Sequence, residues 1–141
     1  MEELLVYAIL LYEEIITEEV YENRLNEMFI EDCNNEILLH LEWENNFKNA
    51  ISFIRTNVDY DNFNHKIFGK ALMGLLKKYY SDCNDINLFG YKMYSLWESL
   101  PGNIQDIEPF WTLSYADDPL SWKDEMQSRE LYEKAFNYYE E

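Results

Sequence analysis

The sequence has 141 residues, of which 48% are hydrophobic and 17% aromatic, and it carries a formal net charge of −17. This length and apolar content suit a folded domain with a buried core and exclude a disordered chain. The charge disfavours binding to nucleic acid or to an anionic membrane and favours a basic protein partner, although acidity also serves solubility.

The acidic residues are concentrated toward the two ends of the chain. Residues 1–45 contain thirteen acidic residues and one basic residue, Arg24. Residues 106–141 contain ten acidic and three basic residues, whereas residues 46–105 contain five acidic and seven basic residues. Either acidic end could therefore contact a basic partner.

The sequence predicts a cytoplasmic protein without a membrane-spanning helix. No apolar run approaches the ~20 residues that are needed to cross a bilayer. The longest, Leu4–Tyr12, follows Glu2 and Glu3 rather than basic residues, which argues against a signal peptide. Cys33 and Cys83 are isolated, as is typical of packed thiols in a reducing compartment.

Apolar residues at three- and four-residue spacing predict helices along most of the chain. In the first helix this apolar face extends from Leu4 to Ile15. Thr17 is the predicted N-cap of the second helix. A short amphipathic segment follows at Glu36–Glu44, and Phe47 begins the next helix.

The second half of the chain continues this helical pattern. The longest predicted helix runs from about Tyr60 to Tyr80, and the one after it begins near Ile86 and stops at Pro101. The final helix is predicted to begin at about Lys123.

The segment FWTLSY is the one place where a short strand is an alternative, and no repeat, linker or low-complexity region is present. We therefore predict a single all-α domain over residues 1–141, a bundle of about seven helices.

Candidate catalytic and metal-binding residues are few. Glu36, His40 and Glu44 recur at four-residue spacing, so one helix face could present a mixed oxygen and nitrogen ligand set. However, the spacings Glu-x-x-His and His-Glu-x-x-His are absent, and His65 has no carboxylate or cysteine close in sequence. Both cysteines lie beside aspartates, which opposes formation of a thiolate. The sequence therefore predicts no enzyme, no metal and no cofactor.

The lysines at positions 66, 70, 77 and 78 form the only basic run. A nucleic-acid surface at this run would have to overcome the net charge of −17, so we interpret it as a solvated helix face. The nearby FGKALMG segment lacks the lysine–threonine ending and the preceding strand of a phosphate-binding loop.

The segment Phe110–Glu125, FWTLSYADDPLSWKDE, combines aromatic and acidic residues in an unusual way. Adjacent carboxylates seldom achieve the separation that glycosidase catalysis requires. Pro119 disfavours a helical conformation at Asp118, and Asp side chains accept backbone N–H bonds at turns. A turn leading into the last helix is therefore the structural interpretation, with Asp124 and Glu125 near the positive end of the helix dipole.

The functional interpretation of this segment is a binding surface for a partner rich in arginine and lysine. Its aromatic residues would be desolvated anchors, and its carboxylates would pair with arginine. The alternative is that the tryptophans belong to the core and the acidic residues surround them. The predicted partner-binding residues are Trp111, Tyr115, Asp117, Asp118, Trp122, Asp124 and Glu125.

This segment, together with KMYSLWESLP before it, resembles segments of bacterial immunity proteins from polymorphic toxin and contact-dependent growth inhibition systems. The similarity covers about the last third of the chain and is closest to partners of RNase toxins, including the EndoU type. It implies a protein that binds a basic nuclease toxin domain and covers its active site or substrate-binding face. No individual residue role is transferred from the family.

Three other functions remain open at this stage. The chain could mimic nucleic acid through spaced carboxylates and inhibit a DNA-binding enzyme. It could be a metal-dependent helical enzyme if three ligands gather around one histidine, or an adaptor that recognises a host peptide.

Overall fold

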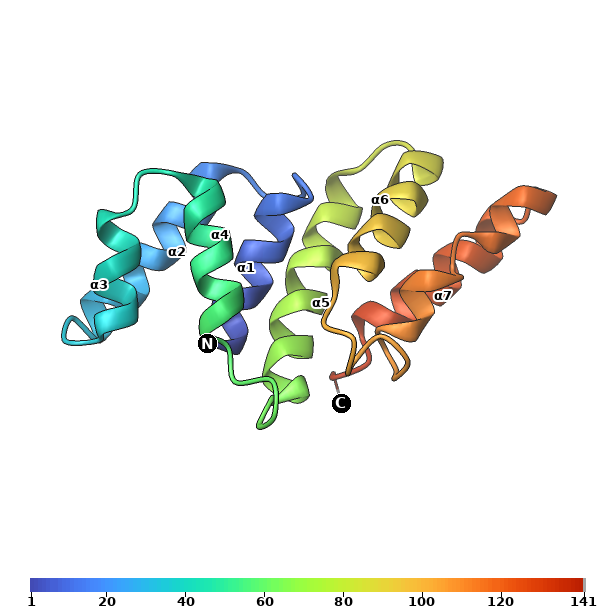
Figure 1. The fold of residues 1–141 in the computed structure, drawn as a ribbon. Helices are drawn as coiled ribbons and strands as arrows, with labels where there is room; N and C mark the ends of the chain where they lie inside the picture. The colour runs from blue at the N-terminus through green and yellow to red at the C-terminus, as the bar shows by residue number, and fades with distance from the viewer. Residues whose placement is uncertain (141) are drawn as a thin grey trace. The chain divides into compact units, whose positions relative to one another are not determined.

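The computed structural model describes residues 1–140, which fold into seven α-helices and two 3₁₀-helices with no strand among them (Figure 1). The predicted all-α class is therefore confirmed. The backbone forms two compact units, Met1–Phe63 and a second that begins at Asn64. The assignment of the whole chain to one domain stays a prediction.

The first unit contains α1 (Glu2–Tyr12), α2 (Glu18–Glu31), α3 (Glu36–Trp43) and α4 (Phe47–Asn57). α1 packs against α2 and α4, and α2 packs against α3 (Figure 1). The side chains of Leu5, Ile9 and Ile54 are fully buried and belong to the core.

Side-chain caps explain where these helices begin. Thr17 Oγ1 accepts a hydrogen bond from the Val20 backbone N–H at 3.3 Å, which confirms the predicted cap. Asn35 and Asn46 cap α3 and α4 in the same way. The first helix ends at Tyr12 rather than Ile15, because Glu14 adopts a left-handed conformation with φ of 60°.

The second unit contains α5 (His65–Asp82), α6 (Ile86–Ser99), η1 (Trp111–Ser114), η2 (Asp118–Trp122) and α7 (Glu125–Phe136). The prediction that the longest helix begins near Tyr60 is wrong. Asp59 Oδ1 accepts the backbone N–H groups of Asp61 and Asn62, which forms a turn, and Asn64 then caps α5.

Aromatic side chains from three helices form the core of this unit. Phe89 of α6 lies at their centre, with ring centroids 5.1 Å from Tyr80 of α5 and 4.9 Å from Tyr132 of α7. Phe136 of α7 contacts the same ring at 6.0 Å. Each such pair adds stabilisation beyond the area that it buries, so these contacts fix α7 against α5 and α6.

No helix within residues 1–140 is both long and apolar enough to cross a membrane.

Candidate protein-binding surface

The segment between α6 and α7 folds as two successive 3₁₀-helices rather than as a strand. Its buried residues include Phe110, Leu113, Ala116 and Pro119, which recur at every third position, and also Ile104, Pro109 and Thr112. A 3₁₀-helix has three residues per turn, so residues at this spacing within or next to one such helix tend to lie on the same side of it. η1 packs against α6 and α7, and η2 packs against α7.

Asp118 opens η2, which corrects the expectation that Pro119 keeps it out of a helical turn. Proline fits the first turn of a helix because the N–H that it lacks would have no intrahelical acceptor there. Lys123 then ends η2 in a left-handed conformation, with φ of 62°, and the chain turns into α7. The predicted turn before the last helix therefore lies at Lys123, whereas Asp118 and Pro119, to which it was assigned, belong to η2.

Four aromatic side chains of this unit form a continuous chain of ring contacts, which we call the aromatic row. Ring centroids are separated by 5.9 Å between Tyr94 and Trp97, 5.9 Å between Trp97 and Trp111, and 6.2 Å between Trp111 and Tyr115. Tyr94 and Trp111 are 42% and 41% exposed, and the other two are partly exposed. The row thus presents aromatic surface to solvent.

Hydrogen bonds hold the centre of the row in place. Trp97 Nε1 donates to the Gln105 carbonyl oxygen at 2.9 Å, and Gln105 Nε2 donates back to the Trp97 carbonyl oxygen at 3.0 Å. This reciprocal pair joins the end of α6 to the loop before η1. The Trp97 ring is therefore oriented before any partner binds.

An apolar groove lies beside the row, with a volume of about 290 Å³. It is lined by Glu108, Pro109, Thr112, Tyr115, Leu131, Lys134, Ala135 and Tyr138. Tyr115 belongs to both features, so the row leads into the groove. The Thr112 hydroxyl donates to a carboxylate oxygen of Glu108, which fixes one wall.

Asp117 has a structural position that the sequence did not indicate. It is half-buried against α6, where a β-carbon placed on Gly90 would lie 2.8 Å from the Asp117 β-carbon. Burial raises the pKa of the Asp117 carboxyl above its usual value, and the charge of Asp118 raises it further. Asp117 is consequently poorly placed as a charged contact, whereas Asp118 is exposed.

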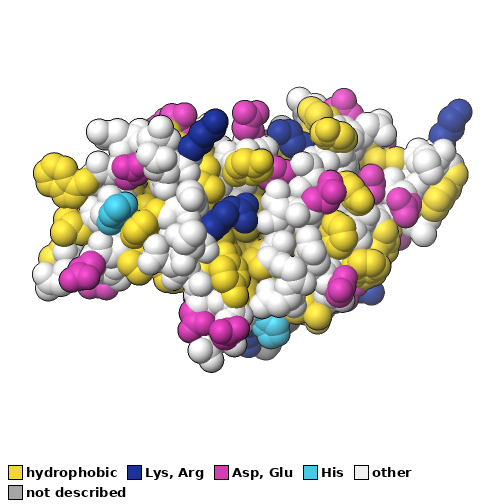
Figure 2. Space-filling view, viewed as in Figure 1, with side chains coloured by type: hydrophobic (Ala, Val, Ile, Leu, Met, Phe, Trp, Pro, Cys, Tyr) yellow, Lys and Arg dark blue, Asp and Glu magenta, His cyan; other side chains and the backbone are white. Residues whose placement is uncertain are grey.

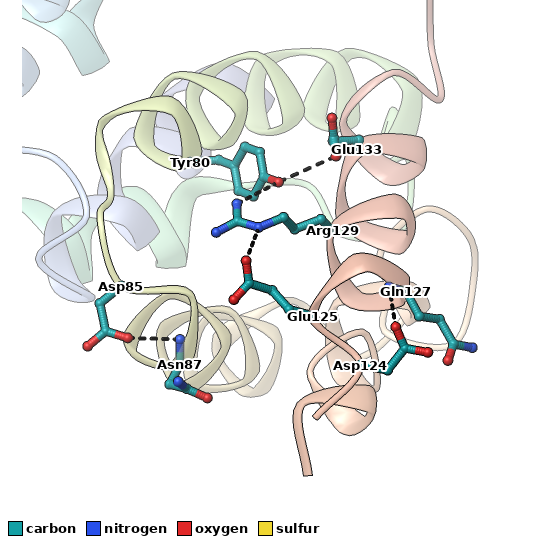
Figure 3. Close-up of polar contacts among 8 residues, drawn as sticks. All are labelled: Tyr80, Asp85, Asn87, Asp124, Glu125, Gln127, Arg129 and Glu133. Atoms are coloured by element: carbon teal, nitrogen blue, oxygen red, sulfur yellow. Dashed lines mark hydrogen bonds and ion pairs between the residues drawn. The ribbon is translucent and has the colours of Figure 1, made fainter. Parts of the chain in front are cut away.

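Asp124 and Glu125 lie at the start of α7, as predicted, and both already have partners (Figure 3). Asp124 Oδ1 accepts the Gln127 backbone N–H at 3.1 Å as the N-cap of the helix. Glu125 Oε2 accepts from Arg129 Nε at 2.8 Å, and Arg129 Nη1 donates to the Tyr80 hydroxyl oxygen at 3.1 Å. These carboxylates already stabilise α7, so they are less available for contact with another protein.

The structure therefore brings together two of the seven predicted residues, Trp111 and Tyr115. Trp122 is 60% exposed but makes no ring contact within residues 1–140. Tyr94 and Trp97 were missed as site residues, because Trp97 also fits the three- and four-residue apolar spacing of a buried helix face. The spacing of the aromatic residues along α6 was the signal that could have indicated a site. The sequence could not show that Trp97 contacts Trp111, because the two residues are more than ten positions apart.

The alternative metal site does not assemble as the sequence suggested. Glu44 is the C-cap of α3 and has an extended backbone, with φ of −86° and ψ of 117°, so it leaves the helix face that carries Glu36 and His40. The His40 ring stacks on Phe53, with centroids 3.9 Å apart. Among the described residues no three His, Cys, Asp or Glu side chains are grouped so that they could hold a metal ion.

The two units share an acidic character. Unit one has fifteen acidic and three basic residues, and the rest of the chain has thirteen acidic and eight basic residues. On the face drawn in Figure 2, acidic and apolar side chains lie interspersed over α6 and α7. Such mixing is the arrangement expected where aromatic anchors are surrounded by charges that attract a basic partner.

Comparison with protein-family models, curated proteins and solved structures finds no match for this chain. The resemblance to immunity proteins therefore stays a prediction. The functional argument rests on the aromatic row, the apolar groove and the charge.

Proposed function

We propose that this protein is an immunity protein that binds and neutralises a cognate basic nuclease toxin domain, and that it does so through protein contact rather than catalysis. The observation that carries the proposal is the aromatic row Tyr94–Trp97–Trp111–Tyr115, which is partly exposed and held in place. The sequence resemblance to immunity proteins supports the same function.

Aromatic rings of this kind suit the centre of a protein interface. Tryptophan and tyrosine bury a large area with few rotatable bonds, so they lose little conformational entropy on binding. Because Gln105 already orients Trp97, part of that ordering is complete in the free protein. The adjoining apolar groove could receive an aliphatic or aromatic side chain of the toxin.

The charge would act mainly on the rate of encounter. A net charge of −17 attracts a basic nuclease, and steered association of oppositely charged proteins reaches ~10⁸ M⁻¹s⁻¹ or more at low salt. Salt screens this attraction over ~10 Å, whereas the buried aromatic contacts are affected less. The complex should therefore form more slowly as salt rises.

Neutralisation requires that the bound protein exclude RNA or another nucleic-acid substrate from the toxin. The acidic residues of this chain, when it is bound to the toxin, would also repel the phosphate backbone of a nucleic-acid substrate that approached the toxin. This chain would then need no catalytic residue of its own, in agreement with the prediction that it is not an enzyme.

The direct test uses the product of the gene immediately upstream as the candidate toxin. The two proteins are co-purified, their affinity is measured by titration at several salt concentrations, and nuclease activity is assayed with and without this chain. We expect tight binding, an association rate that falls with salt, and loss of nuclease activity. Absence of binding, or binding that leaves the nuclease active, would overturn the proposal.

A further inference from the structure

A second groove lies in the first unit, and we call it the acidic groove. It has a volume of about 340 Å³ and lies between the beginning of α2, the end of α3 and the beginning of α4. Its lining is predominantly polar and consists of Tyr21, Glu22, Asn23, Asn26, Leu41, Glu42, Glu44, Asn45 and Phe47.

The carboxylates of this groove have no cationic partner among the residues that the structure describes. Glu22, Glu42 and Glu44 make no ion pair or side-chain hydrogen bond within residues 1–140. By contrast, Glu3 in the same unit is paired with Arg24, whose Nε lies 2.6 Å from a Glu3 oxygen. No ion pair within residues 1–140 therefore occupies these carboxylates, and their oxygens are available as hydrogen-bond acceptors.

Tyr21 provides a second, independent observation at this place. Its side chain is almost completely buried, with 3% exposure, yet its hydroxyl group has no hydrogen-bond partner in the described part of the chain. Tyr21 lines the groove together with Glu22 and Glu42. Burial raises the pKa of Tyr21 to about 12, and the negative charges of Glu42 and Glu22 raise it further. A buried hydroxyl without a partner costs free energy, which a bound donor would recover.

We propose that the acidic groove binds an arginine side chain presented by the basic protein partner. This inference extends the proposed function, since it names a contact in the first unit that the partner would use. Carboxylate and carboxamide oxygens would accept hydrogen bonds from the guanidinium group, and the Tyr21 hydroxyl oxygen would accept one more.

Arginine fits this lining better than lysine or a metal ion does. The guanidinium group is planar and carries several N–H donors, so it can bond to acceptors on different walls and also lie against aromatic rings. Phe47 supplies such a ring, because it is partly exposed and lies with its ring centroid 6.0 Å from that of Tyr21. A metal ion would need ligands at ~2.0–2.6 Å from a single point, and the described residues offer no such group of three.

The first experiment needs no toxin. Backbone amide signals of the full chain are followed by heteronuclear NMR during titration with N-acetyl-arginine amide, and then with the lysine and citrulline equivalents. Citrulline has nearly the same shape as arginine but no charge, which makes it the matched control ligand. We expect arginine to shift the signals of Glu22, Asn23 and Asn45, lysine to bind at least ~3-fold more weakly, and citrulline to cause no shift.

Variants then locate the binding. The double variant Glu42→Gln/Glu44→Gln should weaken arginine binding ~10-fold or more. Its control is Glu31→Gln/Glu36→Gln, which removes the same charge at the opposite ends of α2 and α3 and should change affinity less than ~2-fold.

Tyr21→Phe distinguishes a binding role from a structural one. The variant removes a hydroxyl that has no partner in the free protein, so the midpoint of thermal unfolding should stay the same or rise. Arginine binding should nevertheless weaken ~3- to 10-fold. A fall in unfolding midpoint with unchanged binding would show that the hydroxyl is structural and would overturn its assigned role.

The acidic groove and the toxin partnership can fail separately. If arginine shifts no signal in the groove, or if citrulline or the control variant gives the same result, the arginine site is wrong whatever the toxin assay shows. If arginine binds as expected but no toxin is neutralised, the proposed function is wrong and the groove belongs to another basic partner.

Discussion

Gly90 and Asp117 approach so closely that a β-carbon on Gly90 would lie 2.8 Å from the Asp117 β-carbon. Gly90 is in α6, and Asp117 precedes η2, so this contact seats the two 3₁₀-helices on the helix that carries Tyr94 and Trp97. The position of the aromatic row therefore depends on a glycine that contributes no side chain to it.

Gly90→Ala should destabilise the protein, because the new methyl group would meet atoms close to the backbone that cannot move away cheaply. Overpacking of this kind costs ~1–3 kcal/mol, of which the better helix propensity of alanine recovers up to ~1 kcal/mol. Gly74→Ala is the matched control, since nothing lies within 4 Å of a β-carbon there, and it should stabilise by ~0.5–1 kcal/mol. Chemical denaturation of both variants checks the pair, and equal effects would contradict the close contact.

Asp117→Asn should stabilise the protein at neutral pH. Burial raises the pKa of Asp117 in the folded state, so the folded protein favours the protonated form more than the unfolded chain does. The stability that this group contributes is therefore present below the unfolded pKa of ~3.9 and is lost as the pH rises through the raised folded pKa. Asparagine stays neutral at every pH, so the variant should not lose this stability as the pH rises.

Thermal unfolding of wild type and Asp117→Asn at several pH values measures this effect. The gap between their unfolding midpoints should be largest at neutral pH and should close toward about pH 3.5. Asp118→Asn is the control, because Asp118 is exposed and should show a smaller change. A gap that widens as pH falls would contradict the assignment.

Trp111→Ala should weaken binding of the proposed toxin by ~30-fold or more, as expected for an aromatic anchor at the centre of an interface. Loss of its contacts with Trp97 and Tyr115 should cost ~1–2 kcal/mol of stability and leave the protein folded. Ile30→Ala, at a side chain that is 76% exposed in the other unit, is the control and should leave affinity unchanged. Titration of the toxin with each variant provides the measurement.

Arg24→Lys should destabilise the first unit by ~1 kcal/mol, because arginine joins α2 to α1 with two parallel hydrogen bonds. Arg24 Nε and Nη2 donate to the two carboxylate oxygens of Glu3 at 2.6 and 3.1 Å. Lysine cannot make this forked contact. Glu27→Gln removes only the charge of the exposed second partner of Arg24 and should cost less than ~0.5 kcal/mol in urea denaturation.

The sequence determined the helical class and most helix starts, because these depend on local chemistry. Apolar spacing identified the helices, and Thr17 and Asp124 cap α2 and α7 through bonds to residues three positions away. Helix ends were less predictable. The apolar spacing does not indicate the turn at Asp59 or the left-handed conformation of Glu14. The helix expected from Tyr60 therefore included residues of that turn, and the first helix was expected to continue past Glu14.

The candidate binding surfaces depended on tertiary structure, because their members come from different helices. Sequence proximity grouped Asp117, Asp124 and Glu125 with Trp111. Folding instead half-buries Asp117 and gives Asp124 and Glu125 partners within α7. It instead places Trp111 beside Trp97, fourteen positions away. Charge and aromatic content could be counted along the chain, but which carboxylates stay unpaired is decided only when distant segments meet.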